Sequence, residues 1–243
     1  MPGDTLEFED IHKSFHGAEV LRGLTASIPL SKVTFVVGKS GGGKSVLCRL
    51  AVGLEKPDSG KVVLLGAPVS DLIEDELMSV RRRAPYLVQG PALLDWLTVE
   101  QNVALAAKAS PEGSVEEAIA RVGIGEFAQR FPPQLSPGVK KRAAIARALV
   151  LKPRYLLLDE PTTGLDRLAT KQVNEVLRKL KQEGLGALVV SHDYRSLEAT
   201  ADEVLMVSDG TVGFRGTPAE FLTSSAKEIR ALTNPEVEGV HHG

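Results

Sequence analysis

The sequence of 243 residues contains a single cysteine, Cys48, and no long apolar run. One cysteine excludes an internal disulfide bond and is typical of a protein in a reducing compartment. No apolar segment approaches the ~20 residues that a membrane-spanning helix requires, so we expect none. The first ten residues carry acids and lack an apolar core, which predicts no signal peptide. These absences favour a cytosolic protein that reaches a membrane only through a partner.

Excess positive charge is also lacking. There are 29 Lys and Arg against 31 Asp and Glu, the net charge is −2, and a basic run such as Arg81–Arg83 is short. Proteins that bind nucleic acid usually carry a basic patch or stripe, so we expect no nucleic-acid partner. The basic run is interpreted as the solvated end of a helix. The composition, 43% hydrophobic and 25% charged, is that of an ordinary globular protein.

A glycine-rich segment follows the apolar run 34–37 and precedes a predicted helix. It matches the phosphate-binding pattern G-x-x-x-x-G-K-[ST] at every fixed position. Glycines leave backbone N–H groups free to surround an anion, and the N-terminal end of a helix attracts negative charge. A glycine-rich turn without a ligand is the alternative. The pattern predicts ATP binding by Gly38, Lys39, Ser40, Gly41, Gly42, Gly43, Lys44, Ser45 and Val46, with Lys44 on the β/γ-phosphates and Ser45 on Mg²⁺.

Apolar runs alternate with helical segments through most of the chain, which predicts an α/β domain with a largely parallel, doubly wound sheet. Short strands at 6–9, 20–24 and 25–28 predict an antiparallel flap, with Phe15 in a loop. Helical signals dominate between 91 and 149, and the last predicted helix there spans 139–150. We therefore expect one domain, with a core at 1–89 and 155–222, a helical subdomain at 90–154 and a C-terminal extension at 223–243.

Polar residues follow four predicted strands, at Gly38, Gln89, Asp159 and His192. Ligands of parallel sheets bind at the carboxyl ends of the strands, so these residues are expected to converge on one edge. Asp159 is assigned to Mg²⁺, through a water molecule, and Glu160 to the general base that activates the attacking water. His192 is expected to hold that water and contact the γ-phosphate, and Gln89 to contact Mg²⁺ and the γ-phosphate.

Three of these assignments have alternatives that the sequence leaves open. The Asp159–Glu160 pair, taken in isolation, is also common as the exposed end of a strand. His192 is equally suited to capping a helix. Phe15 is either a core aromatic or a face on which adenine stacks.

The order of the motifs resembles that of ATP-binding-cassette (ABC) ATPase subunits. Gly38–Ser45, Gln89, Leu135–Val139, Leu156–Glu160, Pro161–Asp166 and His192 look like the Walker A, Q-loop, signature, Walker B, D-loop and H-loop motifs of that family. The resemblance spans the chain from Leu6 to about Leu222. It implies a P-loop NTPase of the RecA-like, ABC ATPase fold, and an enzyme that hydrolyses ATP with Mg²⁺.

The resemblance also implies a head-to-tail dimer that closes on two ATP molecules. Lys44 and Ser45 of one copy then face the signature residues Ser136, Pro137 and Gly138 of the other, and Asp166 lies in the D-loop. Phe15 stands where the family usually has a tyrosine against adenine. Hydrolysis reopens the dimer, and the groove near Gln89 passes the motion to a membrane permease. Apolar residues after Gln89 suit either core packing or contact with that permease: Ala92, Leu93, Leu94 and Trp96.

The signature motif departs from the usual Leu-Ser-Gly-Gly-Gln, because Pro137 replaces its first glycine and Val139 its glutamine. Proline removes an N–H group but is tolerated at the start of a helix. Since Ser136, Gly138, Glu160 and His192 are present, we expect slower dimer closure and not an inactive site.

Three stretches resemble the lipid-transport branch of the family, the Mla/MCE type: Gly43–Leu47, Leu87–Asp95 and Lys140–Ala148. The terminal segment Phe221–Leu232 does so as well. This resemblance implies a phospholipid transporter with permease subunits and an MCE-domain protein, at the cytoplasmic face of the inner membrane. The alternatives are the ATPase of a small-solute importer, for example of amino acids, and a soluble ATP-dependent switch that hydrolyses poorly.

Overall fold

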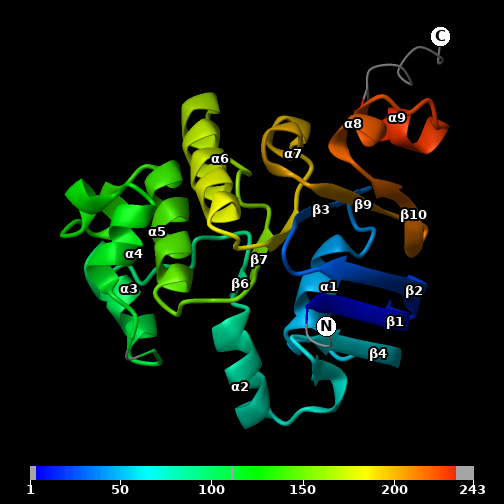
Figure 1. The fold of residues 1–243 in the computed structure, drawn as a ribbon, viewed down its shortest axis with the longest axis horizontal. Helices are drawn as coiled ribbons and strands as arrows, with labels where there is room; N and C mark the ends of the chain where they lie inside the picture. The colour runs from blue at the N-terminus through cyan, green and yellow to red at the C-terminus, as the bar shows by residue number, and fades with distance from the viewer. Residues whose placement is uncertain (1–3, 111, 234–243) are drawn as a thin grey trace.

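The structure, a computed structural model, describes residues 4–110 and 112–233. The last ten residues of the predicted C-terminal extension lie outside this part of the chain. Figure 1 shows strands at the centre and right of the molecule and a group of helices, α3, α4 and α5, at the left.

The larger sheet has six strands in the order β10-β9-β3-β8-β7-β6. All neighbours pair in parallel except β9 and β10, which form an antiparallel hairpin around Asp209 and Gly210. The strands are β3 (Val33–Gly38), β6 (Tyr86–Leu87), β7 (Leu156–Asp159), β8 (Ala187–Val190), β9 (Glu203–Ser208) and β10 (Thr211–Gly216). The largely parallel sheet is therefore confirmed. All four residues of β7 and of β8 are buried, as expected for strands covered on both faces.

The smaller sheet is antiparallel, in the order β2-β1-β4-β5, and confirms the predicted flap. Its strands are β1 (Thr5–Phe15), β2 (Ala18–Pro29), β4 (Ser59–Leu64) and β5 (Ala67–Pro68). Two details of the prediction are wrong. The second and third predicted strands are one continuous strand, β2, because its pairing with β1 runs from Ala18 to Pro29, with register shifts along the way. Phe15 is the last residue of β1 and does not lie in a loop.

The helical subdomain contains α3 (Val99–Ala107), α4 (Val115–Arg121) and α5 (Pro137–Leu149), with short 3₁₀ turns η2 (Gly125–Phe127) and η3 (Pro132–Gln134). Thr98 and Ser114 cap α3 and α4 through their hydroxyl groups. Helix α5 begins two residues earlier than predicted. Ser136 is its N-cap and Pro137 its first residue, where a missing N–H costs no intrahelical hydrogen bond.

The remaining helices are α1 (Lys44–Ala51), α2 (Glu74–Arg83), α6 (Arg167–Gln182), α7 (Tyr194–Thr200), α8 (Pro218–Leu222) and α9 (Lys227–Thr233), with the 3₁₀ turn η1 (Val69–Asp71). Two of them, α7 and α9, are not predicted from the sequence. They are single seven-residue segments, too short for a periodic apolar pattern to identify. Among the described helices none is both long and apolar enough to cross a membrane.

Strand β3 separates the two hydrophobic cores. Val33, Phe35 and Val37 pack into the cluster that includes α5 and α6, whereas Val36 packs into the cluster that includes α1 and the antiparallel sheet. Successive side chains of a strand point to opposite faces, so β3 joins both clusters. This rigid centre supports Gly38, the residue at which the glycine-rich loop begins.

Candidate functional site

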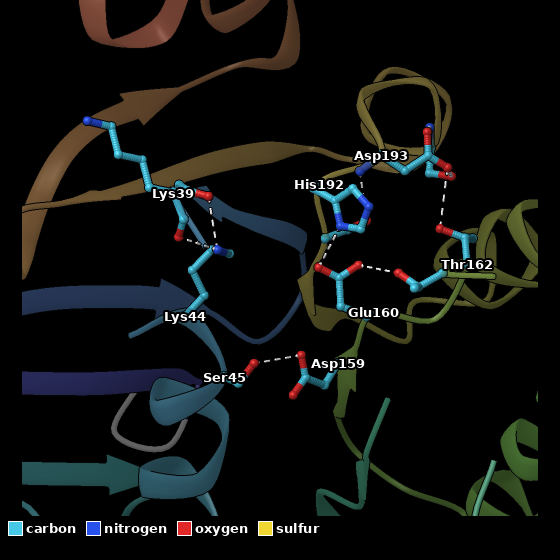
Figure 2. A network of polar contacts seen from close by, with 12 residues as sticks. Lys39, Lys44, Ser45, Asp159, Glu160, Thr162, His192 and Asp193 are labelled. Carbon is cyan, nitrogen blue, oxygen red and sulfur yellow. Dashed lines mark hydrogen bonds and ion pairs between the residues drawn. The ribbon is translucent and has the colours of Figure 1, made fainter. Parts of the chain in front are cut away.

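The predicted site residues meet at the carboxyl edge of the parallel sheet. Gly38 ends β3 and Asp159 ends β7, and Gln89 and His192 each lie two residues beyond β6 and β8. Because β3, β8, β7 and β6 are neighbours in the sheet, their carboxyl ends lie together. Figure 2 shows Lys44, Ser45, Asp159, Glu160 and His192 around one region.

The loop 38–43 curls around the side chain of Lys44. The ammonium group donates hydrogen bonds to the main-chain oxygens of Gly38 (2.9 Å) and Lys39 (2.7 Å; Figure 2). Burial lowers the pKa of Lys44, while Glu160 and Asp159 act in the opposite direction. This cation is held by two main-chain carbonyl groups at the glycine-rich loop, where phosphate oxygens, which bind ammonium groups strongly, can replace them.

Two glycines of the loop are required for different physical reasons. A Cβ atom on Gly38 would lie 2.3 Å from the main-chain oxygen of Val207, so this glycine lets the loop pass close to β9. Gly41 has open space around it, but its φ of +76° is a conformation that side chains disfavour. Val46 buries its side chain in the core, so its expected contact with nucleotide is through the backbone.

The second part of the site is a row of three oxygen-bearing side chains. The Ser45 hydroxyl donates to Oδ1 of Asp159 at 2.9 Å, and the Tyr86 hydroxyl donates to Oδ2 at 2.8 Å. Burial raises the pKa of Tyr86, so the phenol stays protonated and remains a donor. Tyr86 is not predicted from the sequence. The available signal is its place on β6, the strand that pairs with β7.

Glu160 directly follows β7 and is held in an unusual backbone conformation. Its φ is +50°, a left-handed value that costs a residue other than glycine about 1–3 kcal/mol. Its N–H donates to the main-chain oxygen of Val190 at 2.8 Å. One carboxylate oxygen lies 2.9 Å from Nδ1 of His192 (Figure 2). The other accepts a hydrogen bond of 2.7 Å from the Thr163 hydroxyl. The Thr163 hydroxyl therefore holds the Glu160 carboxylate beside the His192 ring.

His192 does not cap a helix, so that alternative is wrong. Asp193 is the N-cap of α7, and its carboxylate accepts hydrogen bonds from the N–H groups of Arg195 and Ser196. The same carboxylate accepts a hydrogen bond from the Thr162 hydroxyl at 3.3 Å. The His192 side chain is 68% exposed, which leaves it accessible to a ligand beside Glu160.

Gln89 and Phe15 lie at the margins of the site. Gln89 is exposed, and the contact that the structure gives it is through its main-chain oxygen, which accepts from Lys141. Phe15 is half-buried against the core around α1, and the Lys13 ammonium lies 5.1 Å from its ring centroid. Both readings of Phe15 thus stay compatible with its place, since part of the ring packs and part is accessible.

The signature residues differ in exposure along α5. Ser136 and Pro137 are exposed, whereas Gly138 is buried. A Cβ atom on Gly138 would lie 2.6 Å from Cβ of Ala169, so this glycine lets α5 pack closely on the start of α6. Asp166 is the N-cap of α6 and accepts from the N–H of Ala169 at 2.8 Å. The predicted D-loop aspartate therefore also fixes the helix against which the signature packs.

Comparison with known proteins agrees with this geometry. The family described as "ABC transporter" matches residues 21–163. The aliphatic sulfonates import ATP-binding protein SsuB 2 of Pseudomonas fluorescens strain Pf-5 is 38% identical over 214 residues, covering 88% of this chain and 77% of the relative. SsuB of P. fluorescens strain Pf0-1 is 35% identical over 240 residues, covering 98% of this chain and 82% of the relative.

Two solved structures share the fold. The post-hydrolysis dimer of the ATP-binding cassette MJ0796, bound to ADP and Pi, has a TM-score of 0.80 and 27% identity, covering 88% of this chain and 98% of the other. The cbiO1 subunit of a Clostridium perfringens ABC transporter has a TM-score of 0.80 and 29% identity, covering 96% and 95%. The family match and the similarity to these relatives and structures establish that the chain belongs to the ABC transporter family, as an ATP-binding subunit with the fold of an ATPase.

Proposed function

We propose that two copies of this chain bind two ATP molecules head to tail and hydrolyse them to drive a membrane permease. The observation that carries the proposal is the Glu160–His192 pair beside the Ser45–Asp159 pair. The first pair provides a base and a group to hold the attacking water, and the second provides metal-binding oxygens. Lys44 and the loop 38–46 hold the phosphates, with Ser136, Pro137 and Gly138 supplied by the second copy.

The donor atoms of Ser45 and Asp159 suit Mg²⁺, which prefers oxygen ligands and is commonly held by one or two protein groups plus phosphate oxygens. Their oxygens are 2.9 Å apart and lie at the start of α1 and the end of β7. Gln89 is the third proposed ligand. Mg²⁺, when bound, neutralises charge on the phosphates, and the side chains of this chain position it and the water.

A groove beside Gln89 supports contact with a permease. It has a volume of about 330 Å³ and is lined mainly by residues 85–88 and 90–92 and by α5, including Arg147. Val88 is 43% exposed and Trp96 is 71% exposed, whereas Leu93 packs partly against the core. We propose that permease subunits dock here and hold the chain at the cytoplasmic face of the inner membrane. The division into core, helical subdomain and C-terminal extension at the boundaries given above belongs to the same proposal.

For the cargo, we propose a small solute taken up by an importer. The relatives reported above are named as importers of aliphatic sulfonates, at 35–38% identity over most of this chain. They favour the small-solute alternative over phospholipid transport, and they give no support for an MCE-domain partner. Phospholipid transport is supported only by the short stretches that resemble the Mla/MCE type, including the segment Phe221–Leu232.

Purification of the native complex tests the cargo class. The chain would be tagged, extracted from its own membranes in mild detergent, and its partners identified by mass spectrometry. A permease with a solute-binding protein is the expected result. A permease with an MCE-domain protein would instead support phospholipid transport. The absence of any permease would contradict both and favour the soluble switch.

Tyr86→Phe is expected to raise the Mg²⁺ concentration that gives half-maximal ATP turnover by about tenfold, the effect typical of a group that orients a metal ligand. The Tyr86 hydroxyl bonds Asp159 directly. Tyr155→Phe is the matched control, because the Tyr155 hydroxyl is buried near the same core and has no hydrogen-bond partner among the described residues. Equal Mg²⁺ dependence of the two variants would show that Tyr86 does not position Asp159.

Pro137→Gly is expected to increase ATP turnover several-fold. Proline at the first position of α5 lacks an N–H group that a glycine would offer to a phosphate across the dimer, and charge-assisted hydrogen bonds of this kind contribute about 1.5–3 kcal/mol. Turnover at saturating ATP and the ATP-dependent dimer fraction by size-exclusion chromatography provide the measurement. Unchanged turnover would make Pro137 irrelevant to closure.

A further inference from the structure

A buried lysine joins the signature helix to two loops of the nucleotide site. Lys141 lies on α5, five residues after Ser136, and is only 9% exposed. Its ammonium group donates hydrogen bonds to the main-chain oxygen of Gln89 and, at 3.0 Å, to that of Glu160. Three segments that are distant in sequence thus meet at one charged group.

Packing alone does not explain a lysine at this position. The neighbouring buried residues of α5 are mostly apolar, including Ala144 and Ile145, and burying a charge is unfavourable unless it is paired or hydrogen-bonded. Burial lowers the pKa of Lys141, while the carboxylates of Glu160 and Asp159 act in the opposite direction. An apolar side chain of similar length would fill the space but would hold neither carbonyl group.

The contact with Glu160 matters because of the backbone conformation of that residue. A left-handed φ orients the peptide group after Glu160, and that orientation must be held by the surroundings. The other contacts described above for Glu160 come from Val190, Thr163 and His192, which all belong to the core. Among the described contacts, Lys141 supplies the hydrogen bond from the helical subdomain.

A second contact connects the same helix to the loop after Gln89. Arg147 donates to the main-chain oxygens of Ala92 at 2.7 Å and Pro91 at 3.5 Å. Helix α5 therefore holds the segment 89–92 through two side chains six positions apart, Lys141 and Arg147. A displacement of α5 relative to the core would move this loop and the Glu160 peptide together.

We propose that Lys141 is a positioning residue for ATP hydrolysis, which ties the orientation of Glu160 and Gln89 to the position of the signature helix. Ser136, at the start of the same helix, faces the nucleotide of the second copy. In a head-to-tail dimer, Glu160 of a chain acts at one nucleotide and Ser136 of the same chain contacts the other nucleotide. Contact of Ser136 with the second nucleotide then aligns Glu160 at the first. This inference rests on the proposed function, since it concerns the same reaction.

Lys141→Met tests the proposal, because methionine is long and unbranched but donates no hydrogen bond. We expect kcat for ATP to fall by about 10²-fold, the effect of displacing a catalytic group by about 1 Å. Affinity for ATP without Mg²⁺, measured with a fluorescent ATP analogue, is expected to stay within twofold, because Lys141 does not touch the loop 38–46. Lys141→Arg keeps N–H donors and is expected to recover most of the lost kcat.

Lys181→Met is the matched control for a purely structural lysine. Lys181, in the last turn of α6, also joins separate segments of the chain. It contacts the main-chain oxygen of Thr200 at 3.2 Å and the carboxylate of Asp202 at 2.7 Å, and neither residue belongs to the proposed site. We expect this variant to lower the midpoint of thermal unfolding and to keep wild-type kcat at a temperature where it is folded.

The possible failures are distinguishable. A folded Lys141→Met variant with wild-type kcat would overturn the role of Lys141 and leave the proposed function intact. A wild-type chain that bound ATP but never hydrolysed it, alone or with its permease, would overturn the proposed function itself. If Lys141→Met does not fold, Lys141→Gln, which keeps one neutral donor group, is expected to lose about tenfold in kcat. Wild-type kcat in that variant would contradict the proposal equally.

Discussion

Glu160→Gln is expected to reduce ATP turnover by about 10²–10⁴-fold, the usual contribution of a positioned general base. Glutamine has nearly the same shape, and its amide oxygen can keep one of the two contacts, either that with the Thr163 hydroxyl or that with His192, while its NH₂ group faces the other. It cannot take a proton from water. The loss should therefore appear in kcat, measured as phosphate release at saturating ATP, with affinity for ATP unchanged.

The same variant is expected to accumulate as an ATP-bound dimer. If hydrolysis reopens the dimer, blocking the chemical step leaves the closed form populated, and size-exclusion chromatography with ATP and Mg²⁺ should show it. Glu198→Gln, an exposed glutamate on α7, provides the control and should behave as wild type. Wild-type turnover in Glu160→Gln would remove Glu160 from the mechanism. Neither wild-type turnover nor the absence of an ATP-bound dimer in this variant would contradict the assignment of the fold.

Lys44→Met is expected to weaken ATP binding by about 10- to 100-fold, which corresponds to the 1.5–3 kcal/mol of hydrogen bonds between charged groups. The variant removes the cation that contacts phosphate and also the two hydrogen bonds that shape the loop, to the main-chain oxygens of Gly38 and Lys39. Fluorescence titration with an ATP analogue measures the affinity directly, without depending on turnover.

The control for this prediction is Lys179→Met, an exposed lysine near the end of α6. It changes the net charge equally and should bind ATP as the wild type does. Unchanged affinity in Lys44→Met would mean that the loop binds phosphate through its N–H groups alone. Equal losses in the two variants would indicate a general electrostatic effect and not a specific contact.

These two predictions address separate parts of the site. Lys44 belongs to the loop between β3 and α1, and Glu160 follows β7, yet burial lowers the pKa of Lys44 against an opposing effect of Glu160. The two side chains therefore affect each other electrostatically. Residues that interact are not additive in their effects, so the double variant should lose less than the product of the two single losses.

The sequence by itself determined the nucleotide-binding loop and its position in the fold. The pattern Gly38–Ser45 is local: glycines, lysine and serine at fixed spacing between a strand and a helix identify phosphate binding before any tertiary contact is known. The parallel sheet followed from the alternation of apolar runs and helical segments. Convergence of Asp159, Glu160 and His192 followed from the rule that carboxyl ends of parallel strands share an edge.

The tertiary structure alone decided how these residues are held. Tyr86, Thr163 and Lys141 reach Asp159 or Glu160 from other elements or by turns of the chain, and no periodicity in the sequence marks them. The left-handed conformation of Glu160 depends on neighbours that hold its N–H and its carbonyl oxygen, so a local pattern does not reveal it. Local motifs specify which chemical groups are present. Their orientation depends on packing between segments far apart in sequence, and only the folded chain brings those segments together.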